Sequence, residues 1–299
     1  MKLNGVEIDD TYAEAFPIKV GRVLITAVSH KWANVAATEA TGFGTSIIMC
    51  PAEAGIDVEV DGSQTPDGRP GVYILICTPG YKKLEEQLLA RTGQCILTAP
   101  TASMFNGLPD AEKQFDTGFK LKFFGDGFES QVDVGGRKAY KIPMMEGDFI
   151  AEHNIGAVEG VAGGNFFILA DTQMNALEAA EKAVKAIRSV PGTCTPFPGG
   201  IVASGSKVGS LKYSKFMHAT TNHKFAPTLR GIVADSDVPA DINGIYEIVI
   251  DGIDLKSVTA ATKAGIEAAV KMPGVKKISA GNYGGTLGPY KISLHELFK

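Results

Sequence analysis

The side chain with the clearest chemical potential is Glu247, in the strand-like segment IYEIVI at residues 245–250. Side chains alternate between the two faces of a strand, so Glu247 shares a face with Ile245 and Val249. A charge on an apolar face costs free energy unless it is paired or functional. Burial would raise the pKa of this carboxyl toward neutrality, where it could both take up and return a proton. The alternative is an edge-strand glutamate that reaches solvent.

Four further polar side chains are candidates because they also lie near predicted strand ends, although the case for each is weaker than for Glu247. Glu53, in CPAEAG, follows an apolar run and could be a second acid/base carboxyl. Tyr246, Asn282 and Tyr283 lie near the ends of the strands that would hold Glu247. Their types suit substrate binding or stabilisation of a negative oxygen.

Glycine-rich segments follow several predicted strands: GVAGGN at 160–165, PFPGGIVASGSKVGS at 196–210 and AGNYGGTLG at 280–288. Glycine lets the backbone approach a ligand closely, although tight turns and packing between lobes would use it equally well. The middle segment supplies the binding candidates Gly199, Gly200, Ser204, Ser206 and Lys207. Lys207 suits a ligand with a carboxylate or phosphate, and its alternative is a solvated surface lysine.

Known catalytic motifs are missing. Residues 42–47 (GFGTSI) follow a predicted helix and end in isoleucine, so they fail as a dinucleotide loop. Residues 200–207 approach a phosphate-binding loop, but the lysine stands one place late. The five histidines show no HxxxH or HExxH spacing, and no G-x-S-x-G elbow is present. We therefore expect neither a metal site nor a serine nucleophile.

The elements that must position these residues follow one pattern, strand–helix–strand, which occurs four times. The apolar strands begin the units at 22–28, 72–77, 165–170 and 245–250, the helices cover about 30–41, 81–92, 174–189 and 255–271, and the return strands are predicted at 45–50, 94–98, 201–203 and 275–279. Two such units in each half predict an α+β protein with two similar ferredoxin-like (split βαβ) lobes from an internal duplication.

The predicted lobes cover 1–149 and 150–299, with extra β-hairpins between them at about 120–160. Gly125–Gly127 and Gly135–Gly136 are the expected turns of those hairpins. The weakly periodic stretch 213–234 is predicted to be a surface excursion.

Composition limits the classes of function. The chain has 299 residues, a formal net charge of −4 and no long basic stretch, which argues against nucleic-acid binding. No apolar run approaches the ~20 residues of a membrane helix, and residues 1–10 lack the plan of a signal peptide. We therefore expect a cytoplasmic protein that binds no membrane. Its four cysteines are far apart, as reduced core residues would be.

Long stretches of the chain resemble one family. They include NGVEIDDTYAEAFP, ATGFGTSIIMCPAEAGI, GQCILTAPTASMFNGLP, MEGDFIAEHNIG, PFPGGIVASGSKVGS, YEIVIDG and KKISAGNYGG, and together with shorter matches they cover nearly the whole sequence. On these residues the chain resembles formylmethanofuran:tetrahydromethanopterin formyltransferases. The match is weakest at about 213–241. At Thr286 the resemblance leads us to expect a basic residue, so no anion-binding role is assigned there.

The resemblance implies two α/β lobes, a homo-oligomer of dimers that pair into a tetramer, and a cleft near a subunit interface. It implies no prosthetic group, because methanofuran and tetrahydromethanopterin are carrier substrates. The glutamate of YEIVI, Glu247, would be the acid/base. Lys207, Arg69 and Lys277 are candidates to bind the anionic groups of the carriers. The alternatives are a non-catalytic small-molecule-binding module, or a subunit active only within a larger formyltransferase/hydrolase complex.

Overall fold

The first lobe is a four-stranded antiparallel sheet with two helices. The structure, a computed structural model, describes residues 1–299. In spatial order the strands are β6 (Ser103–Asn106), β3 (Tyr12–Thr26), β5 (Gly71–Thr78) and β4 (Glu53–Val60). Helices α1 (His30–Thr41) and α2 (Tyr81–Arg91) bury small and branched side chains against this sheet, including Ala36, Leu84 and Leu88. Ser29 precedes α1 in the extended conformation of an N-cap residue, but its side chain makes no capping hydrogen bond.

The second lobe repeats this order. Its strands are β16 (Val275–Ser279), β11 (Ile155–Ala170), β15 (Gly244–Gly252) and β12 (Thr193–Cys194). Helices α4 (Gln173–Ile187) and α5 (Leu255–Ala269) are capped by the side chains of Thr172 and Asp254 and share a second core with the sheet. Both lobes place the first and third strands in the centre, which is the split βαβ arrangement. The predicted fold class is confirmed.

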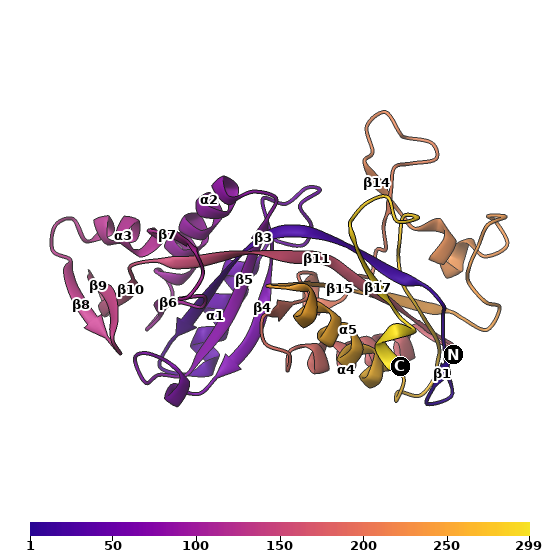
Figure 1. Cartoon of the computed structure of the whole chain (residues 1–299), viewed down its shortest axis with the longest axis horizontal. Coiled ribbons are helices and arrows are strands. Elements are labelled where there is room, and N and C mark those ends of the chain that lie inside the picture. The colour runs from indigo at the N-terminus through magenta and orange to yellow at the C-terminus, as the bar shows by residue number, and fades with distance from the viewer.

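Two long strands join the lobes. Residues 16–21 of β3 pair with residues 157–162 of β11, so each strand belongs to both sheets (Figure 1). At this crossing a Cβ on Gly160 would lie 2.2 Å from the carbonyl oxygen of Gly252, so only glycine fits. The termini complete the second lobe: β1 (Lys2–Leu3) pairs with β2 (Val6–Ile8), β2 pairs with β16, and β17 (Tyr290–Ser293) pairs with β3. A domain division near residue 150 stays a prediction.

The segment between the lobes extends the first sheet with hairpins, as expected. It contains β7 (Lys113–Phe115), α3 (Thr117–Leu121), β8 (Ser130–Val134), β9 (Arg137–Met144) and β10 (Gly147–Glu152). Gly135 and Gly136 form the β8–β9 turn with φ of +60° and +78°, values that favour glycine. Residues 122–125 form a 3₁₀ turn that continues α3, so the helical part of this segment was missed.

Three predicted return strands are wrong. Residues 45–50 form an exposed turn region in which Ile48 and Met49 reach solvent, and the strand begins only at Glu53. Residues 92–96 form a π-turn that continues α2 and buries Ile96, so the predicted strand at 94–98 does not form, and the strand follows at β6. The third return strand is β12, before the predicted 201–203. Short apolar runs do not distinguish strands from helical or partly exposed segments.

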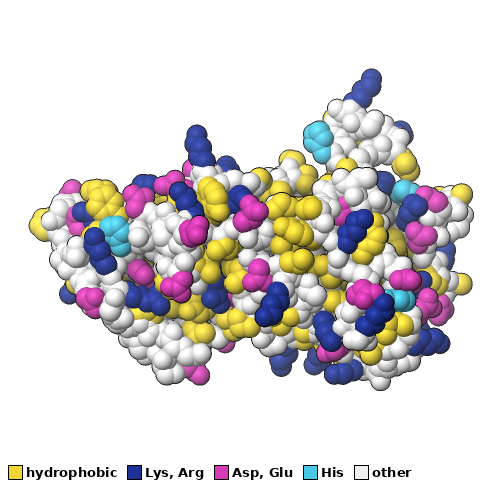
Figure 2. All heavy atoms as spheres, viewed as in Figure 1, with side chains coloured by type: hydrophobic (Ala, Val, Ile, Leu, Met, Phe, Trp, Pro, Cys, Tyr) yellow, Lys and Arg dark blue, Asp and Glu magenta, His cyan; other side chains and the backbone are white.

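Residues 200–243 leave the second lobe as a surface excursion, confirming the prediction for 213–234. The short strands β13 (Lys207–Val208) and β14 (Ala219–Thr220) form a hairpin that projects from the body (Figures 1 and 2). Its tip exposes apolar side chains, among them Leu211 and Phe216. No helix of the chain has the length and apolarity needed to span a membrane.

Candidate active site

Glu247 lies on the face of the second sheet opposite to α4 and α5. Its neighbours in the strand, Ile248 and Ile250, point into the core that the two helices share. Glu247 lies opposite Phe167 of β11, which in turn lies opposite Ser279 of β16. On its other side, the backbone of Val202 exchanges two hydrogen bonds with that of Glu247. The alternation that predicted this orientation for Glu247 is therefore confirmed.

Two neighbouring cavities meet at this side chain. The larger, of about 670 Å³, extends toward residues 9–11 and 277–283, and the smaller, of about 270 Å³, extends toward residues 202–205 and 226–228. Four residues line both cavities: Phe167, Asn222, Phe225 and Glu247. Glu247 is thus part of a wall that the two cavities share, and each cavity could hold one of two ligands.

The environment of Glu247 favours proton exchange near neutral pH. Burial raises the pKa of its carboxyl to about 7, and no charged partner offsets that effect. The ring of Phe167 contributes to the apolar surroundings, packed against Phe225 with ring centroids 4.7 Å apart. A carboxyl with a pKa near the working pH can act as base and as acid in one cycle.

The loop at residues 281–288 brings Asn282 and Tyr283 to the larger cavity. The side-chain amide of Asn282 donates to Thr11 Oγ1 at 3.0 Å and to the carbonyl of Tyr12 at 3.3 Å, so it is already engaged. Burial and the charges of Glu247 and Glu14 raise the pKa of the Tyr283 hydroxyl. Tyr283 therefore remains protonated near neutral pH and can donate a hydrogen bond within the cavity.

Lys207 is the cation of the larger cavity that has no acidic partner. Its Nζ donates to Thr220 Oγ1 and, at 3.1 Å, to the carbonyl of Thr221. Lys277 also lines this cavity but pairs with Asp9 at 2.7 Å. Lys224 pairs with Asp235 at 3.5 Å. Lys207 is thus the lysine whose charge is best placed to attract an anionic ligand.

The predicted candidate Glu53 lies elsewhere. It is buried where the lobes meet, accepts a hydrogen bond from Ile47 N at 3.1 Å and faces the carboxyl of Asp251. Burial is the main cause that raises the pKa of both carboxyls. Asp251 Oδ2 has no N–H or O–H donor, which agrees with a carboxyl that retains a proton.

Two other predicted groups also lie apart from Glu247. Tyr246 points to the opposite face, against the α4–α5 core, with Gln173 Nε2 3.5 Å from its hydroxyl. Gly199 and Gly200 line a separate groove of about 350 Å³ between the lobes, together with Arg188 and Phe43. The same glycine-rich segment nevertheless sends Ser204 to the smaller cavity and, with Lys207, Ser206 to the larger.

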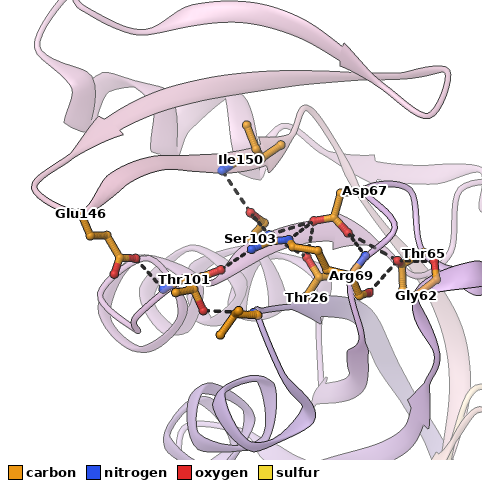
Figure 3. A network of polar contacts seen from close by, with 10 residues as sticks. Thr26, Gly62, Thr65, Asp67, Arg69, Thr101, Ser103, Glu146 and Ile150 are labelled. Carbon is orange, nitrogen blue, oxygen red and sulfur yellow. Dashed lines mark hydrogen bonds and ion pairs between the residues drawn. The ribbon is translucent and has the colours of Figure 1, made fainter.

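Arg69 is committed to a structural network (Figure 3). Its guanidinium donates to Asp67 at 2.9 Å, to the carbonyl of Thr101 at 2.5 Å and to Ser103 Oγ at 2.6 Å. Thr26 Oγ1 accepts a fourth hydrogen bond at 3.1 Å. These bonds tie the β4–β5 loop to the ends of β3 and β6, so Arg69 is not placed to bind a carrier.

Sequence reasoning missed Asn165, Phe167 and Asn222. Asn165 precedes the apolar run FFILA and exchanges hydrogen bonds with Gly281, at 2.6 Å and 3.1 Å. A polar side chain next to the buried run FFILA, inside β11, was a usable signal. Phe167 looked like ordinary core, and Asn222 lies in the weakly periodic excursion. No group of three or more His, Cys, Asp or Glu side chains is arranged to hold a metal ion.

Fold and site together define a two-lobed α+β protein with a carboxyl of raised pKa between two adjoining cavities. A family model described as "Formylmethanofuran-tetrahydromethanopterin formyltransferase" matches residues 1–144, and its companion "FTR, proximal lobe" matches residues 147–297. The formyltransferase of Methanosarcina acetivorans with this name is 68% identical over 100% of both chains. The chain belongs to the formylmethanofuran–tetrahydromethanopterin formyltransferase family, which confirms the resemblance and the predicted enzyme class.

Two solved structures agree with this assignment. The formylmethanofuran:tetrahydromethanopterin formyltransferase from Methanosarcina barkeri is 65% identical, covers 100% of both chains and superposes with a TM-score of 0.98. A chain of the formyltransferase/hydrolase complex from Methylorubrum extorquens, solved with methylofuran, is 41% identical over 100% of this chain and 99% of its own, with a TM-score of 0.94.

Proposed function

We propose that this chain reversibly transfers a formyl group from formylmethanofuran to N5 of tetrahydromethanopterin. The observation that carries this proposal is the position of Glu247 in the wall common to two adjoining cavities. A reaction between two carriers needs space for both and an acid/base group where they meet. Alignment of the two reactants is worth ~7–11 kcal/mol of the barrier when the geometry is right.

In the proposed reaction, N5 attacks the formyl carbon and a tetrahedral intermediate forms with a negative oxygen. The bond from the formyl carbon to the methanofuran nitrogen then breaks. The ionised Glu247 carboxylate takes the proton from N5 and passes it to the departing amine. A pKa of about 7 makes both proton transfers accessible, and the reverse reaction uses the same steps backward.

The developing negative oxygen needs a hydrogen-bond donor, and Asn222 is the residue we assign to it. It lines both cavities beside Glu247. Its backbone carbonyl accepts from Phe225 N at 3.1 Å, whereas its side-chain amide has no partner within the protein. An amide left free at such a point can donate to a substrate. One donor of this kind is typically worth ~3–4 kcal/mol in the transition state.

The carriers bear carboxylates, and one bears a phosphate, so an acidic protein must bind them through local cations. Lys207 is our proposed contact for one anionic tail because it lacks a carboxylate partner. Lys277 is a weaker choice, since Asp9 and Glu7 already compensate its charge.

We also propose a cytoplasmic homo-oligomer, a dimer or tetramer. All four cysteines are free, which fits a reducing compartment. Apolar side chains exposed on the projecting hairpin, including Leu211 and Phe216, fit burial in a contact between copies. Light scattering of the purified chain would test the oligomeric state.

The decisive assay mixes the purified chain with formylmethanofuran and tetrahydromethanopterin. We expect N5-formyl product from the lone chain. Binding of both carriers without turnover would favour a non-catalytic module. Turnover only after addition of partner subunits would favour a component of a larger complex, the setting of the 41% identical bacterial relative.

A further inference from the structure

The carboxylate of Glu14, in β3, accepts hydrogen bonds from backbone N–H groups of the loop at residues 281–288. Its side chain is 2% exposed. Oε2 accepts hydrogen bonds from Tyr283 N at 2.7 Å and Gly285 N at 3.1 Å. Oε1 accepts from Gly288 N at 2.8 Å and from Leu287 N. A carboxylate offers about four acceptor positions, and this loop fills them with four backbone N–H groups.

The first two residues of the loop are also held by hydrogen bonds of the Asn165 and Asn282 side chains. From Tyr283 to Gly288, the hydrogen bonds that tie the loop to β3 all end on Glu14. Four of its eight residues are glycine, which allows many backbone conformations and raises the entropy lost on ordering. Gly284 and Gly285 adopt φ of +69° and +76°. These values turn the peptide groups inward, so that N–H groups from both ends of the loop converge on one carboxylate. Hydrogen bonds to an ionised acceptor are stronger than neutral ones.

The charge state of Glu14 agrees with this geometry. Burial alone would favour the neutral acid, but the four N–H donors outweigh it and lower the pKa of the carboxyl. Glu14 is therefore ionised at neutral pH. It is a buried charge compensated entirely by one loop, and that loop lies more than 260 residues away in sequence.

The loop in turn forms part of the larger cavity. Asn282 and Tyr283 line it together with Glu247, and Gly281 is fixed from the other side by Asn165. The charges of Glu247 and Glu14 both contribute to the raised pKa of the Tyr283 hydroxyl, after burial. Removal of the Glu14 charge would release the backbone that directs Asn282 and Tyr283 into the cavity.

We propose that Glu14 is a positioning residue for formyl transfer, whose carboxylate fixes loop 281–288 so that Tyr283 forms the cavity wall beside Glu247. The catalytic part of this inference rests on the proposed function, whereas the loop geometry does not. In Glu14→Gln the side-chain NH₂ would face backbone N–H donors, so about half of the contacts would become repulsive. In Glu14→Asp the charge remains, although the reach is shorter.

Hydrogen exchange of the unliganded parent tests the loop directly and requires no activity. We expect strong protection of the amides of 283, 285, 287 and 288, and loss of that protection in Glu14→Gln with partial retention in Glu14→Asp. Rapid exchange of these four amides in the parent would overturn the inference, even if Glu14→Gln does not fold. Glu181→Gln, an exposed change on α4, is the matched control.

A double-mutant cycle separates positioning from general destabilisation. We expect Glu14→Gln to lower kcat/KM by about 10²-fold, as misplacement by ~1 Å can do. In a Tyr283→Ala background, where no ring remains to be positioned, the same change should cost less than about threefold. Equal losses in both backgrounds would contradict the positioning role. Absence of formyl transfer in the parent would refute the proposed function instead and leave the exchange result standing.

Discussion

Phe167 on β11 lies directly opposite Glu247 on β15, so an aromatic ring and a carboxyl side chain occupy adjacent positions on one sheet face. Phe167 is 4% exposed and packs against Phe225 of the excursion. The Glu247 side chain is therefore half-buried beside aromatic rings and has no charged partner. Burial raises the pKa of Glu247 to about 7, and we infer that the ring of Phe167 is a main contributor to that burial.

The first prediction follows from that pair. Phe167→Leu should admit water and lower the pKa of Glu247 from about 7 toward its ordinary value of 4.5. The acidic limb of the pH–rate profile should move to lower pH by the same amount. A ¹³C NMR titration would measure the shift, with the signal assigned by its loss in Glu247→Gln. Phe166→Leu is the control, because it loses similar volume on the opposite face.

Lys207→Ala should raise KM for one carrier by about tenfold or more, with little change in kcat, because a charged hydrogen bond is worth about 1.5–3 kcal/mol. Steady-state kinetics with each carrier varied in turn would show which carrier is affected. Lys212→Ala, on the exposed part of the same hairpin, should leave both KM values unchanged. Identical KM values in the parent and Lys207→Ala would remove Lys207 from the site.

Asn222→Ala should lower kcat by about 10²-fold while KM changes little, because the lost hydrogen bond strengthens only as the oxyanion forms. Asn222→Asp keeps the size but places a negative charge beside the developing oxyanion. It should be no more active than the alanine variant. A fall in affinity with normal kcat would instead make Asn222 a ground-state binding residue.

The Glu53–Asp251 pair predicts an unusual pH dependence of stability. Both pKa values are raised in the folded protein, so the folded state retains protons that the unfolded state loses. The pair's contribution is fully present below the unfolded pKa values, ~4, and is lost as pH rises through the folded ones. Asp251→Asn should remove this pH-dependent loss of stability. The variant should therefore become more stable to heat, relative to the parent, as pH rises.

Calorimetry of both proteins at pH 5 and pH 8 would measure that difference. Each kcal/mol corresponds to about 1.5–2 °C in Tm for a chain of 299 residues. A Tm difference that is independent of pH would show that the folded pair does not retain protons that the unfolded chain loses.

Much of the fold could be predicted because local patterns were unambiguous. The helices at 81–91 and 173–187 have regular apolar spacing, and Thr172 caps the second. The predictions of three return strands were wrong for a physical reason. Ile47, Ile48 and Met49 form an apolar run that is largely not buried by this chain, and Ile96 satisfies its burial as part of a helix.

The site was predictable where one strand carried the signal and not where distant segments met. Glu247 was found because a charge interrupts an apolar alternation. The same alternation places Tyr246 on the opposite face of the sheet. Tyr246 was chosen as a site candidate only because it is near the same strand end as Glu247 in the sequence. Glu53 was a polar residue at a strand end, but its partner Asp251 lies on the other lobe, and sequence spacing gives no access to that contact. Glu14, between Ala13 and Ala15, is likewise a charged residue among apolar neighbours, and this signal could have marked it as a candidate.

The turnover number of Glu247→Gln tests the central claim most directly. This change keeps the shape of the side chain and removes its ability to exchange a proton. We predict that kcat for formyl transfer falls by about 10²–10⁴-fold, while KM for both carriers and the melting temperature stay near the parent values. A Glu247→Gln protein with the turnover number of the parent would contradict the proton-transfer role.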